Sequence, residues 1–595
     1  MSRWFDKLGL SERNKYKAII LLSTVLSNIL LFALVISVYP PVWYTNDDFR
    51  MMTIVSGAYT GTPCADIVFM RYPVGLLLSG LYRITPLIPW YGLFTMFCMF
   101  VPSCIFGYYC IKKAYEKNCC LVGIGAYAML FILIIQKYIC MPQYTLTSAF
   151  MGVGAIALIY EMPEKKNSRH IFLAAFCSIM SFSVRTKAFY LLIPILMLIV
   201  AVRVIKEKRS LKKYLVYGCA TLILCSVSGC IDTISWHRDG YQEFKEFKEV
   251  RALIYDYDSI PGYYENMPFY VSNGINEITY RAVADRFLDI DDSVNTENLT
   301  KIADYMEDIK TTKTNLADRL VIAFNDGLSQ WFSSSDATVK YCAIYIFILL
   351  ALCLTLSFKK KKLDIIFIAT VAGFLLEITY LKFHGRVMAR LIDLMLLAMA
   401  VTGTLTILSI IDKGEISFKK FWDKKINIPL EKIWKCVMVC GVAALVVAYA
   451  ANMQSDLKSK SLVLRETNNP LLHALNDYAS KYPDKFFFYD TKNFINCTNY
   501  VFSTCEKGEI INTESMGSWN ARSPSYYARN EKFGFKTSIE GLLSEEHDVY
   551  FVTRVAPKKG ITMPLKDIYN KKLVEVDKIQ TTKDILYVYM VVDDE

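Results

Sequence analysis

The chain has 595 residues, of which 54% are hydrophobic, and its formal net charge is +11. Repeated, nearly uncharged stretches of roughly 14 to 20 residues exclude an ordinary soluble protein and predict a polytopic α-helical membrane protein. The positive charge does not indicate nucleic-acid binding, because the basic residues cluster in short loops between apolar runs, as in the cytoplasmic loops of membrane proteins.

The apolar runs predict about eleven membrane spans, with the N-terminus inside and the C-terminus outside. The predicted spans are residues 18–38, 90–111, 119–137, 143–160, 170–185, 188–204, 214–233, 341–358, 363–381, 387–411 and 433–451. This count places every basic loop on the inner side. Residues 67–84 are also apolar, but a full crossing there would reverse all later loops. We therefore predict a re-entrant or interfacial helix on the outer face.

The topology divides the chain into four regions. They are residues 1–233 (the N-terminal membrane region, with a first outer loop at 39–89), 234–340 (an outer, mainly helical insertion), 341–451 (the C-terminal membrane region) and 452–595 (an outer α/β domain). The α/β prediction rests on a helical stretch followed by short apolar or alternating runs. The helical stretch is 471–482, and the runs are 485–489, 549–553, 573–576 and 585–592. The spacing of Cys497 and Cys505 allows a local disulfide, but spacing alone does not set disulfide geometry, so two free thiols stay the alternative.

An acidic pair, Asp47 and Asp48, stands in the predicted first outer loop shortly after the first span. Such a pair is costly in lipid and unremarkable in water. Taken alone, it is explained as a solvated turn or a helix cap, since aspartate favours both. It gains a function if the rest of the chain folds over it and supplies cationic partners.

Several cations fall on the predicted outer side, against the general charge pattern. They are Arg71, Arg185, Lys187, His384, Arg386 and Arg390. Arginine suits phosphate binding because its guanidinium is planar and always charged. Purely structural roles stay open as alternatives to phosphate binding. Arg185 and Lys187 could simply extend from the ends of spans to water, and Arg390 could pair with Asp393 or Glu377.

Motifs for other chemistries are not found in the sequence. No Cys/His cluster has metal-ligand spacing, and there is no P-loop, dinucleotide fingerprint or nucleophile elbow. Chemistry is therefore expected from the charged residues at the outer ends of the spans. Outer carboxylates with phosphate-competent cations suit transfer from an anionic, lipid-linked donor to a hydroxyl acceptor.

The layout of spans, acidic first outer loop, juxtamembrane helix and outer α/β domain resembles the GT-C superfamily. These are integral-membrane glycosyltransferases that use polyprenyl-phosphate sugars. The runs at 46–49 (Asn-Asp-Asp-Phe), 56–61 (Ser-Gly-Ala-Tyr-Thr-Gly) and 143–147 (Gln-Tyr-Thr-Leu-Thr) are further similar to large membrane proteins of Gram-positive bacteria with this layout. Many relatives carry His-Pro-Pro in the first outer loop, whereas this chain has Arg71-Tyr72-Pro73, which puts the donor class and any metal dependence in doubt.

The resemblance implies sugar transfer from a polyprenyl-phosphate donor to a cell-envelope acceptor, such as a glycan, at the outer face of the plasma membrane. Membrane lipids and the lipid-linked sugar would be the partners. Asp47 or Asp48 would be the general base, with Asp48 favoured because Phe49 adjoins it. The other carboxylate would orient the acceptor or help bind a divalent metal. The six outer cations would hold the donor phosphate.

Two other functions stay open. A transporter or flippase of a lipid-linked saccharide would use the same cations without a carboxylate base. It should carry charged or broken helices at mid-membrane, for which Glu377 is the clearest candidate. A non-catalytic scaffold that presents outer domains would need far fewer spans.

Overall fold

The computed structural model describes residues 12–164, 167–206, 208–256, 260–313, 315–332, 337–360, 365–385, 388–411, 470–494, 499–504, 510–581 and 584–594. The chain divides into two compact units. We call one the membrane unit (Met1–Val42, Gly92–Ser228 and Leu320–Ser461) and the other the sheet unit (Trp43–Tyr91, Gly229–Arg319 and Leu462–Glu595).

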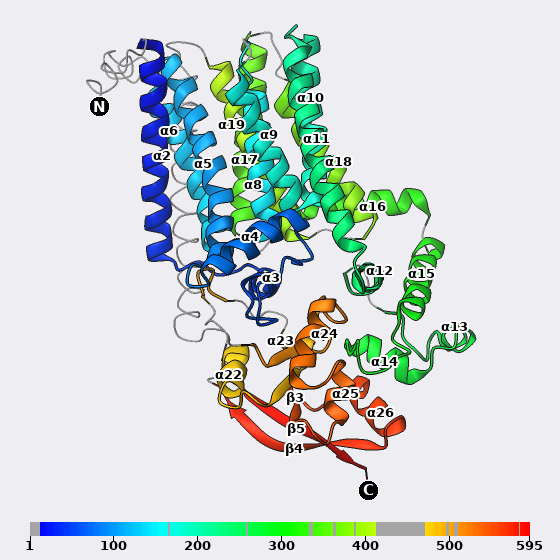
Figure 1. The fold of residues 1–595 in the computed structure, drawn as a ribbon. Coiled ribbons are helices and arrows are strands. Elements are labelled where there is room, and N and C mark those ends of the chain that lie inside the picture. The colour runs from blue at the N-terminus through cyan, green and yellow to red at the C-terminus, as the bar shows by residue number, and fades with distance from the viewer. Residues whose placement is uncertain are drawn as a thin grey trace. The chain divides into compact units, whose positions relative to one another are not determined.

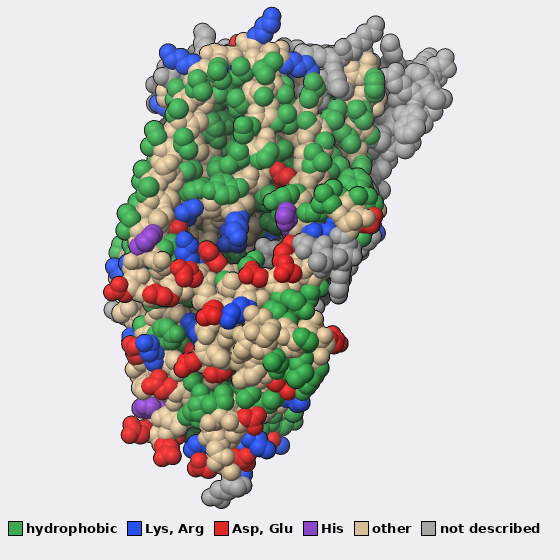
Figure 2. Space-filling model, turned by 90° about the vertical axis from the view of Figure 1, so that its right-hand side faces the viewer, with side chains coloured by type: hydrophobic (Ala, Val, Ile, Leu, Met, Phe, Trp, Pro, Cys, Tyr) green, Lys and Arg blue, Asp and Glu red, His purple; other side chains and the backbone are tan. Residues whose placement is uncertain are grey.

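The membrane unit is built from long apolar helices (Figure 1). Their bounds are α2 (Glu12–Val38), α5 (Trp90–Glu116), α6 (Cys120–Leu130) continued by the π-helix η1 (Phe131–Ile135) and α7 (Gln136–Cys140), α8 (Tyr144–Tyr160), α9 (Ser168–Val184), α10 (Thr186–Ala201) with η2 (Val202–Lys206), α11 (Leu211–Trp236), α17 (Ala337–Lys360), α18 (Ile365–Phe383) and α19 (Ala389–Ile410). Among the described residues, eight helices are long and apolar enough to cross a membrane. Hydrophobic side chains cover this unit on the face shown in Figure 2.

The predicted spans from 18–38 to 387–411 each coincide with one of these helices, and the last, 433–451, lies outside the described residues. A multi-pass helical membrane protein is thereby confirmed, whereas the number of spans and their orientation stay predictions. Two spans, α8 and α9, are shorter, at 17 residues each. Every residue of α8 is buried, so this helix is surrounded by protein.

Small residues let the central helices approach closely. A Cβ at Gly152 of α8 would stand 2.3 Å from Leu192 of α10, and one at Gly403 of α19 would stand 2.6 Å from Phe367 of α18. Membrane helices associate through such close contacts, because lipid offers apolar side chains no hydrophobic gain on packing. The contacts fix α8 and α19, whose first residues carry the candidate site described below.

The sheet unit contains five strands in the order β2-β1-β3-β5-β4. They are β1 (Phe486–Tyr489), β2 (Thr513–Ser515), β3 (Val549–Thr553), β4 (Lys571–Gln580) and β5 (Ile585–Asp593). The first three are parallel and the last two join them in antiparallel fashion. All four residues of β1 are buried, as expected for a central parallel strand covered on both faces. The predicted α/β character of the C-terminal region is confirmed, and β2 is the strand that the sequence did not reveal.

Short helices complete the sheet unit. They are α3 (Asn46–Ser56), α4 (Tyr72–Ile84), α12 (Tyr241–Asp256), α13 (Met267–Ser272), α14 (Glu277–Asp285), α15 (Thr296–Lys313), α22 (Pro470–Ala479), α23 (Thr491–Phe494), α24 (Pro524–Asn530), the 3-10 turn η3 (Glu531–Phe533), α25 (Ser538–Leu543) and α26 (Lys559–Asp567). Helix α16 (Leu316–Phe332) continues from this unit into the membrane unit. At 13 residues, α4 is too short to cross a bilayer, which agrees with a re-entrant or interfacial helix.

The predicted insertion and the C-terminal region share one hydrophobic core. Phe287, which follows α14, meets Phe551 of β3 with ring centroids 5.9 Å apart. The backbone N–H of Leu288 donates to the carbonyl of Met516, beyond β2, at 3.3 Å. Segments that are far apart in sequence therefore fold together here.

Replacing Phe488 in this core tests that account. The side chain is completely buried in β1, so Phe488→Ala should destabilise the sheet unit by about 3–5 kcal/mol. The melting temperature of the full-length protein in detergent would fall measurably. The control, Val574→Ala, removes a side chain that is 40% exposed on β4. Equal melting temperatures for the two variants would contradict the shared core.

Candidate functional site

The acidic pair lies in the first turn of α3, in the sheet unit. Carboxylates are stabilised there by the partial positive charge of a helix N-terminus. The helix ends at Gly57, whose φ of 93° belongs to the left-handed region, and a Cβ there would stand 2.8 Å from the nitrogen of Pro63. The glycine therefore lets the chain turn back tightly and keeps α3 short.

Asp48 is completely buried among aromatic residues. The hydroxyl of Tyr91 donates a hydrogen bond to its Oδ1 at 2.9 Å. The ring of Trp43 meets the ring of Tyr91 edge-on at 5.2 Å, and the hydroxyl of Tyr82 accepts from the backbone N–H of Tyr91 at 3.1 Å. Tyr91 is thus held in place, and its hydroxyl fixes the orientation of the Asp48 carboxylate.

Asp47 occupies a different environment. It is half-buried, and its charge acts on Arg251, a buried side chain that donates to the carbonyl of Gly517 at 2.8 Å. Burial lowers the pKa of Arg251, while the negative charges of Asp256 and Asp47 oppose that shift. The two adjacent carboxylates therefore have separate surroundings, as needed if they have separate roles.

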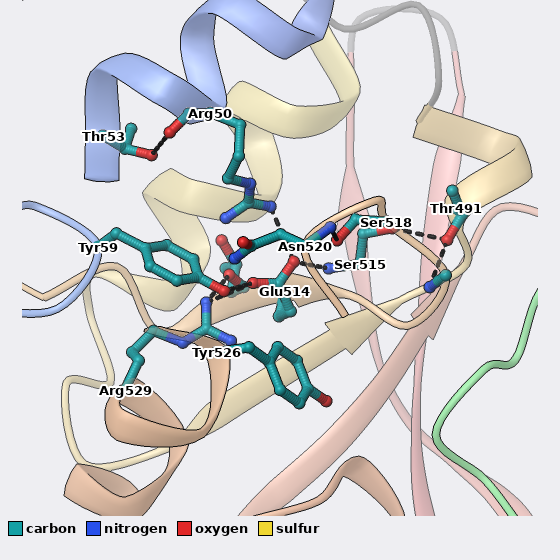
Figure 3. A network of polar contacts seen from close by, with 12 residues as sticks. Arg50, Thr53, Tyr59, Thr491, Glu514, Ser515, Ser518, Asn520, Tyr526 and Arg529 are labelled. Atoms are coloured by element: carbon teal, nitrogen blue, oxygen red, sulfur yellow. Dashed lines mark hydrogen bonds and ion pairs between the residues drawn. The ribbon is translucent and has the colours of Figure 1, made fainter. Parts of the chain in front are cut away.

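A buried charge network ties α3 to the sheet (Figure 3). Arg50, two positions after Asp48, places Nη2 2.9 Å from Oε1 of Glu514 in β2. Nη1 of Arg529, from α24, lies 2.7 Å from Oε2 of the same carboxylate. The hydroxyl of Tyr59 donates to Oε2 at 2.5 Å, and the backbone N–H of Ser515 donates to Oε1 at 2.9 Å. Both oxygens of Glu514 are thus satisfied twice.

The positive charges in this network offset the effect of burial on the pKa of the Glu514 carboxyl. Burial alone would raise the pKa of the Glu514 carboxyl, but the positive charges of Arg50 and Arg529, with the hydrogen bonds from Tyr59 and Ser515, hold that pKa below its usual range. The Tyr59 ring contacts both guanidiniums, with its centroid 4.9 Å from Cζ of Arg50 and 4.4 Å from Cζ of Arg529. The N-terminal turn of α3 is thereby fixed by charge as well as by packing.

Arg71 has a carboxylate partner in the sheet unit. Its Nη1 lies 2.9 Å from Oδ2 of Asp232, and the backbone N–H of Tyr72 donates to Oδ1 at 2.8 Å. Asp232 therefore caps the start of α4. This geometry gives Arg71 a structural role, whereas its predicted contact with a donor phosphate stays a prediction.

Two predicted cations of the membrane unit converge on one aromatic ring. Arg185 stands between α9 and α10, and Arg390 lies in the first turn of α19. Their Cζ atoms lie 5.2 Å and 5.8 Å from the ring centroid of Tyr144, the first residue of α8. Tyr144 is itself buried. Two like charges thus share one ring at a junction of four helices, an arrangement suited to an anion.

Unsatisfied polar atoms flank that ring. The side-chain oxygen of Gln143 accepts from the backbone N–H of Thr145 at 2.8 Å. Within the described part of the chain, Nε2 of Gln143 and Oγ1 of Thr145 are buried and make no hydrogen bond. Buried polar groups are almost always paired, so these two atoms indicate a polar ligand or water. Nearby on α7 and α19, Nζ of Lys137 lies 3.9 Å from Oδ1 of Asp393.

The other predicted residues are more scattered. Lys187 is exposed in the first turn of α10, and His384 is exposed beyond α18, with its ring 4.6 Å from that of Tyr380. Arg386, Cys497 and Cys505 lie outside the described residues. Across the described ranges, no group of three or more His, Cys, Asp or Glu side chains could hold a metal ion.

The sequence did not single out Glu514 or Arg529, and it drew attention to Tyr144 only as part of the run 143–147 at the start of a span. For Tyr144 a signal was present, since an amide and an aromatic residue follow Pro142 directly at the start of a span. For Glu514 and Arg529 the sequence carried no signal, because nothing in it pairs them with a residue in the first outer loop.

No protein-family model matches the chain, and neither does any curated protein. Among solved structures, the chain is similar to the crystal structure of ArnT from Cupriavidus metallidurans bound to undecaprenyl phosphate. The comparison covers 95% of this chain and 97% of that chain, with 7% sequence identity and a TM-score of 0.36. A TM-score this low does not show a shared fold or a shared function.

Neutralising Glu514 tests the charge network. Glu514→Gln leaves two guanidiniums without their counter-charge, and breaking a buried ion pair in this way costs about 3–5 kcal/mol. The melting temperature of the full-length protein should fall. The matched control is Glu575→Gln, which breaks a surface pair with Lys578 and should cost at most ~1 kcal/mol. A similar effect from both substitutions would rule out a structural role for the network.

The same network predicts a pH dependence. Because the pKa of Glu514 is lowered in the folded protein, its contribution is complete above the pKa of an unfolded glutamate, ~4.3. The contribution is lost as the pH falls through the lower, folded value. Below about pH 4.3 the difference in melting temperature between wild type and Glu514→Gln should therefore shrink. A constant difference across this range would contradict the assignment.

Proposed function

We propose that this protein is a membrane glycosyltransferase that moves a sugar from a polyprenyl-phosphate donor to a hydroxyl of a cell-envelope acceptor. The observation that carries the proposal is the convergence of Arg185 and Arg390 on Tyr144 in a unit made of apolar helices. Charged residues at such positions are expensive and usually functional. The resemblance of the spans and the first outer loop to the GT-C superfamily supports the same reaction.

The donor phosphate would bind between the two guanidiniums. Arginine forms strong, paired hydrogen bonds with phosphate oxygens, and Nε2 of Gln143 supplies a further buried donor. The polyprenyl chain would follow the hydrophobic surface of the helices. Lys187, His384, Arg386 and Arg71 would extend the positive field around the phosphate, as predicted from the sequence. As the glycosidic bond breaks, the arginines stabilise the charge left on the phosphate.

Asp48 would act as general base in this reaction. Its carboxylate takes the proton from the acceptor hydroxyl while that oxygen bonds to the anomeric carbon. The bond from the anomeric carbon to the phosphate oxygen breaks, and its electron pair leaves with polyprenyl phosphate. The transition state has oxocarbenium character, as in glycoside cleavage. The hydroxyl of Tyr91 would orient the base, and Asp47 would orient the acceptor.

A divalent metal would have Asp47 and Asp48 as its protein ligands. Two adjacent carboxylates supply fewer oxygens than hard cations usually take from protein, water and substrate together. The described residues offer no third His, Cys, Asp or Glu for such a group. The proposed reaction assigns its roles only to side chains of this chain.

The cellular setting follows from the same proposal. The reaction would take place at the outer face of the plasma membrane, with the N-terminus inside and the sheet unit outside, as the loop charges predict. The partners would be membrane lipids, the lipid-linked sugar and an envelope glycan. A flippase would need the arginines but not Asp48, so carboxylate variants separate the two functions.

Amide substitutions at the acidic pair test the base. Asp48→Asn should lower sugar transfer by roughly 10²–10⁴-fold, the usual contribution of a general base. Binding of undecaprenyl phosphate should be unchanged. Asp47→Asn should impair transfer less. The measurement is release of polyprenyl phosphate from a panel of polyprenyl-phosphate sugars by purified protein in nanodiscs. Full activity in both variants would refute the base assignment.

Removing the guanidiniums tests the donor site. Arg185→Ala and Arg390→Ala should each weaken binding of undecaprenyl phosphate about 10- to 100-fold, since a charged hydrogen bond contributes about 1.5–3 kcal/mol. Native mass spectrometry of the full-length protein measures this. Arg169→Ala is the control, because Arg169 is exposed near the opposite end of α9. Unchanged binding in both arginine variants would refute a donor-phosphate site beside Tyr144.

A further inference from the structure

Helix α16 has an apolar face that is exposed in the described part of the chain. Leu316, Leu320, Val321 and Phe324 recur at helical spacing and are 66%, 46%, 59% and 44% exposed. The polar residues Asp318 and Asp326 lie on the opposite side of the helix from Leu320 and Phe324, whereas Asn325, four residues after Val321, lies at the border of the two faces. One residue departs from the pattern: Ile322 is exposed on the polar side. Contiguous exposed apolar residues of this kind usually mark a surface that binds a partner or a membrane.

The position of α16 in the chain identifies the partner. A Cβ at Gly327 would stand 2.7 Å from Cγ2 of Ile378, so α16 touches α18 near the end of that candidate span. Figure 1 shows α16 running across α18 rather than along it. Only residues 333–336 separate α16 from α17, the next candidate span, a reach on the order of 18 Å. Helix α16 therefore lies beside the ends of two candidate spans.

We propose that α16 is an interfacial helix whose apolar face lies among the lipid acyl chains just below the headgroups. Asp318 and Asp326 then face water. Helices that lie in this plane carry one apolar and one polar face, as α16 does. With two aspartates beside Arg319, α16 is held by its apolar face rather than by attraction to anionic lipid.

A lipid surface explains the face better than a second copy of the chain. From Leu316 to Phe324 the face is only about 12 Å long. A stable protein interface needs on the order of 800 Å² from each partner, far more than one such stripe offers. The face is also continuous with candidate spans that themselves need lipid. The close contact at Gly327 then holds α16 in the interface plane against α18.

Site-specific photocrosslinking tests the proposal without any substrate. Leu320 and Phe324 are each replaced by p-benzoylphenylalanine in the full-length protein, which is reconstituted in nanodiscs of one phosphatidylcholine. Illumination should add the mass of one lipid at each position. Asp318 and Asp326, replaced in the same way, are the matched controls on the polar face, and they should give no lipid adduct.

Two results would overturn the assignment. One is crosslinking of Leu320 and Phe324 to a second copy of the chain, which would make the face a protein interface. The other is equal labelling of the two faces, or no lipid adduct at Leu320 and Phe324. Two labelled positions guard against a single substitution that fails to fold. Because the readout is lipid contact, its failure leaves the proposed sugar transfer untouched.

Discussion

The carboxylate of Glu514 is the constraint on which the sheet unit depends. It is completely buried and binds two guanidiniums, one from the first turns of α3 and one from α24. Such a charge is tolerated in a protein interior only when its partners are in place. The network therefore joins Arg50 to Glu514 across 464 positions of sequence, and it fixes the helix that carries Asp47 and Asp48. Packing around Tyr91 then sets the direction of the Asp48 carboxylate.

The membrane unit holds positively charged side chains among apolar helices. The ring of Tyr144 contacts the guanidiniums of Arg185 and Arg390 and stabilises their charge. Close contacts at glycines pack α8 and α19 against their neighbours. Cation–π contacts of this kind strengthen when the groups are removed from water. The proposed donor-phosphate site thus belongs to the membrane unit, and the proposed base belongs to the sheet unit.

The sequence was most informative where one physical signal dominates. Apolar length predicted the helices of the membrane unit, and alternating or apolar runs predicted strands β1, β3, β4 and β5. It was least informative where distant segments meet. Strand β2 has only three residues, and the role of its Glu514 depends on ion pairs with Arg50 and Arg529, which lie elsewhere in the sequence. Arg185 and Arg390 were predicted as cations, but the ring that joins them was not, since ring contacts depend on how helices pack rather than on spacing along the chain.

The most direct test of the account is a structure of the full-length protein in a lipid nanodisc with undecaprenyl phosphate added. The account predicts density for the phosphate in contact with the guanidiniums of Arg185 and Arg390 and within hydrogen-bond distance of the Gln143 amide. A phosphate bound elsewhere on the protein, with Tyr144 still enclosed by the same two arginines, would contradict it.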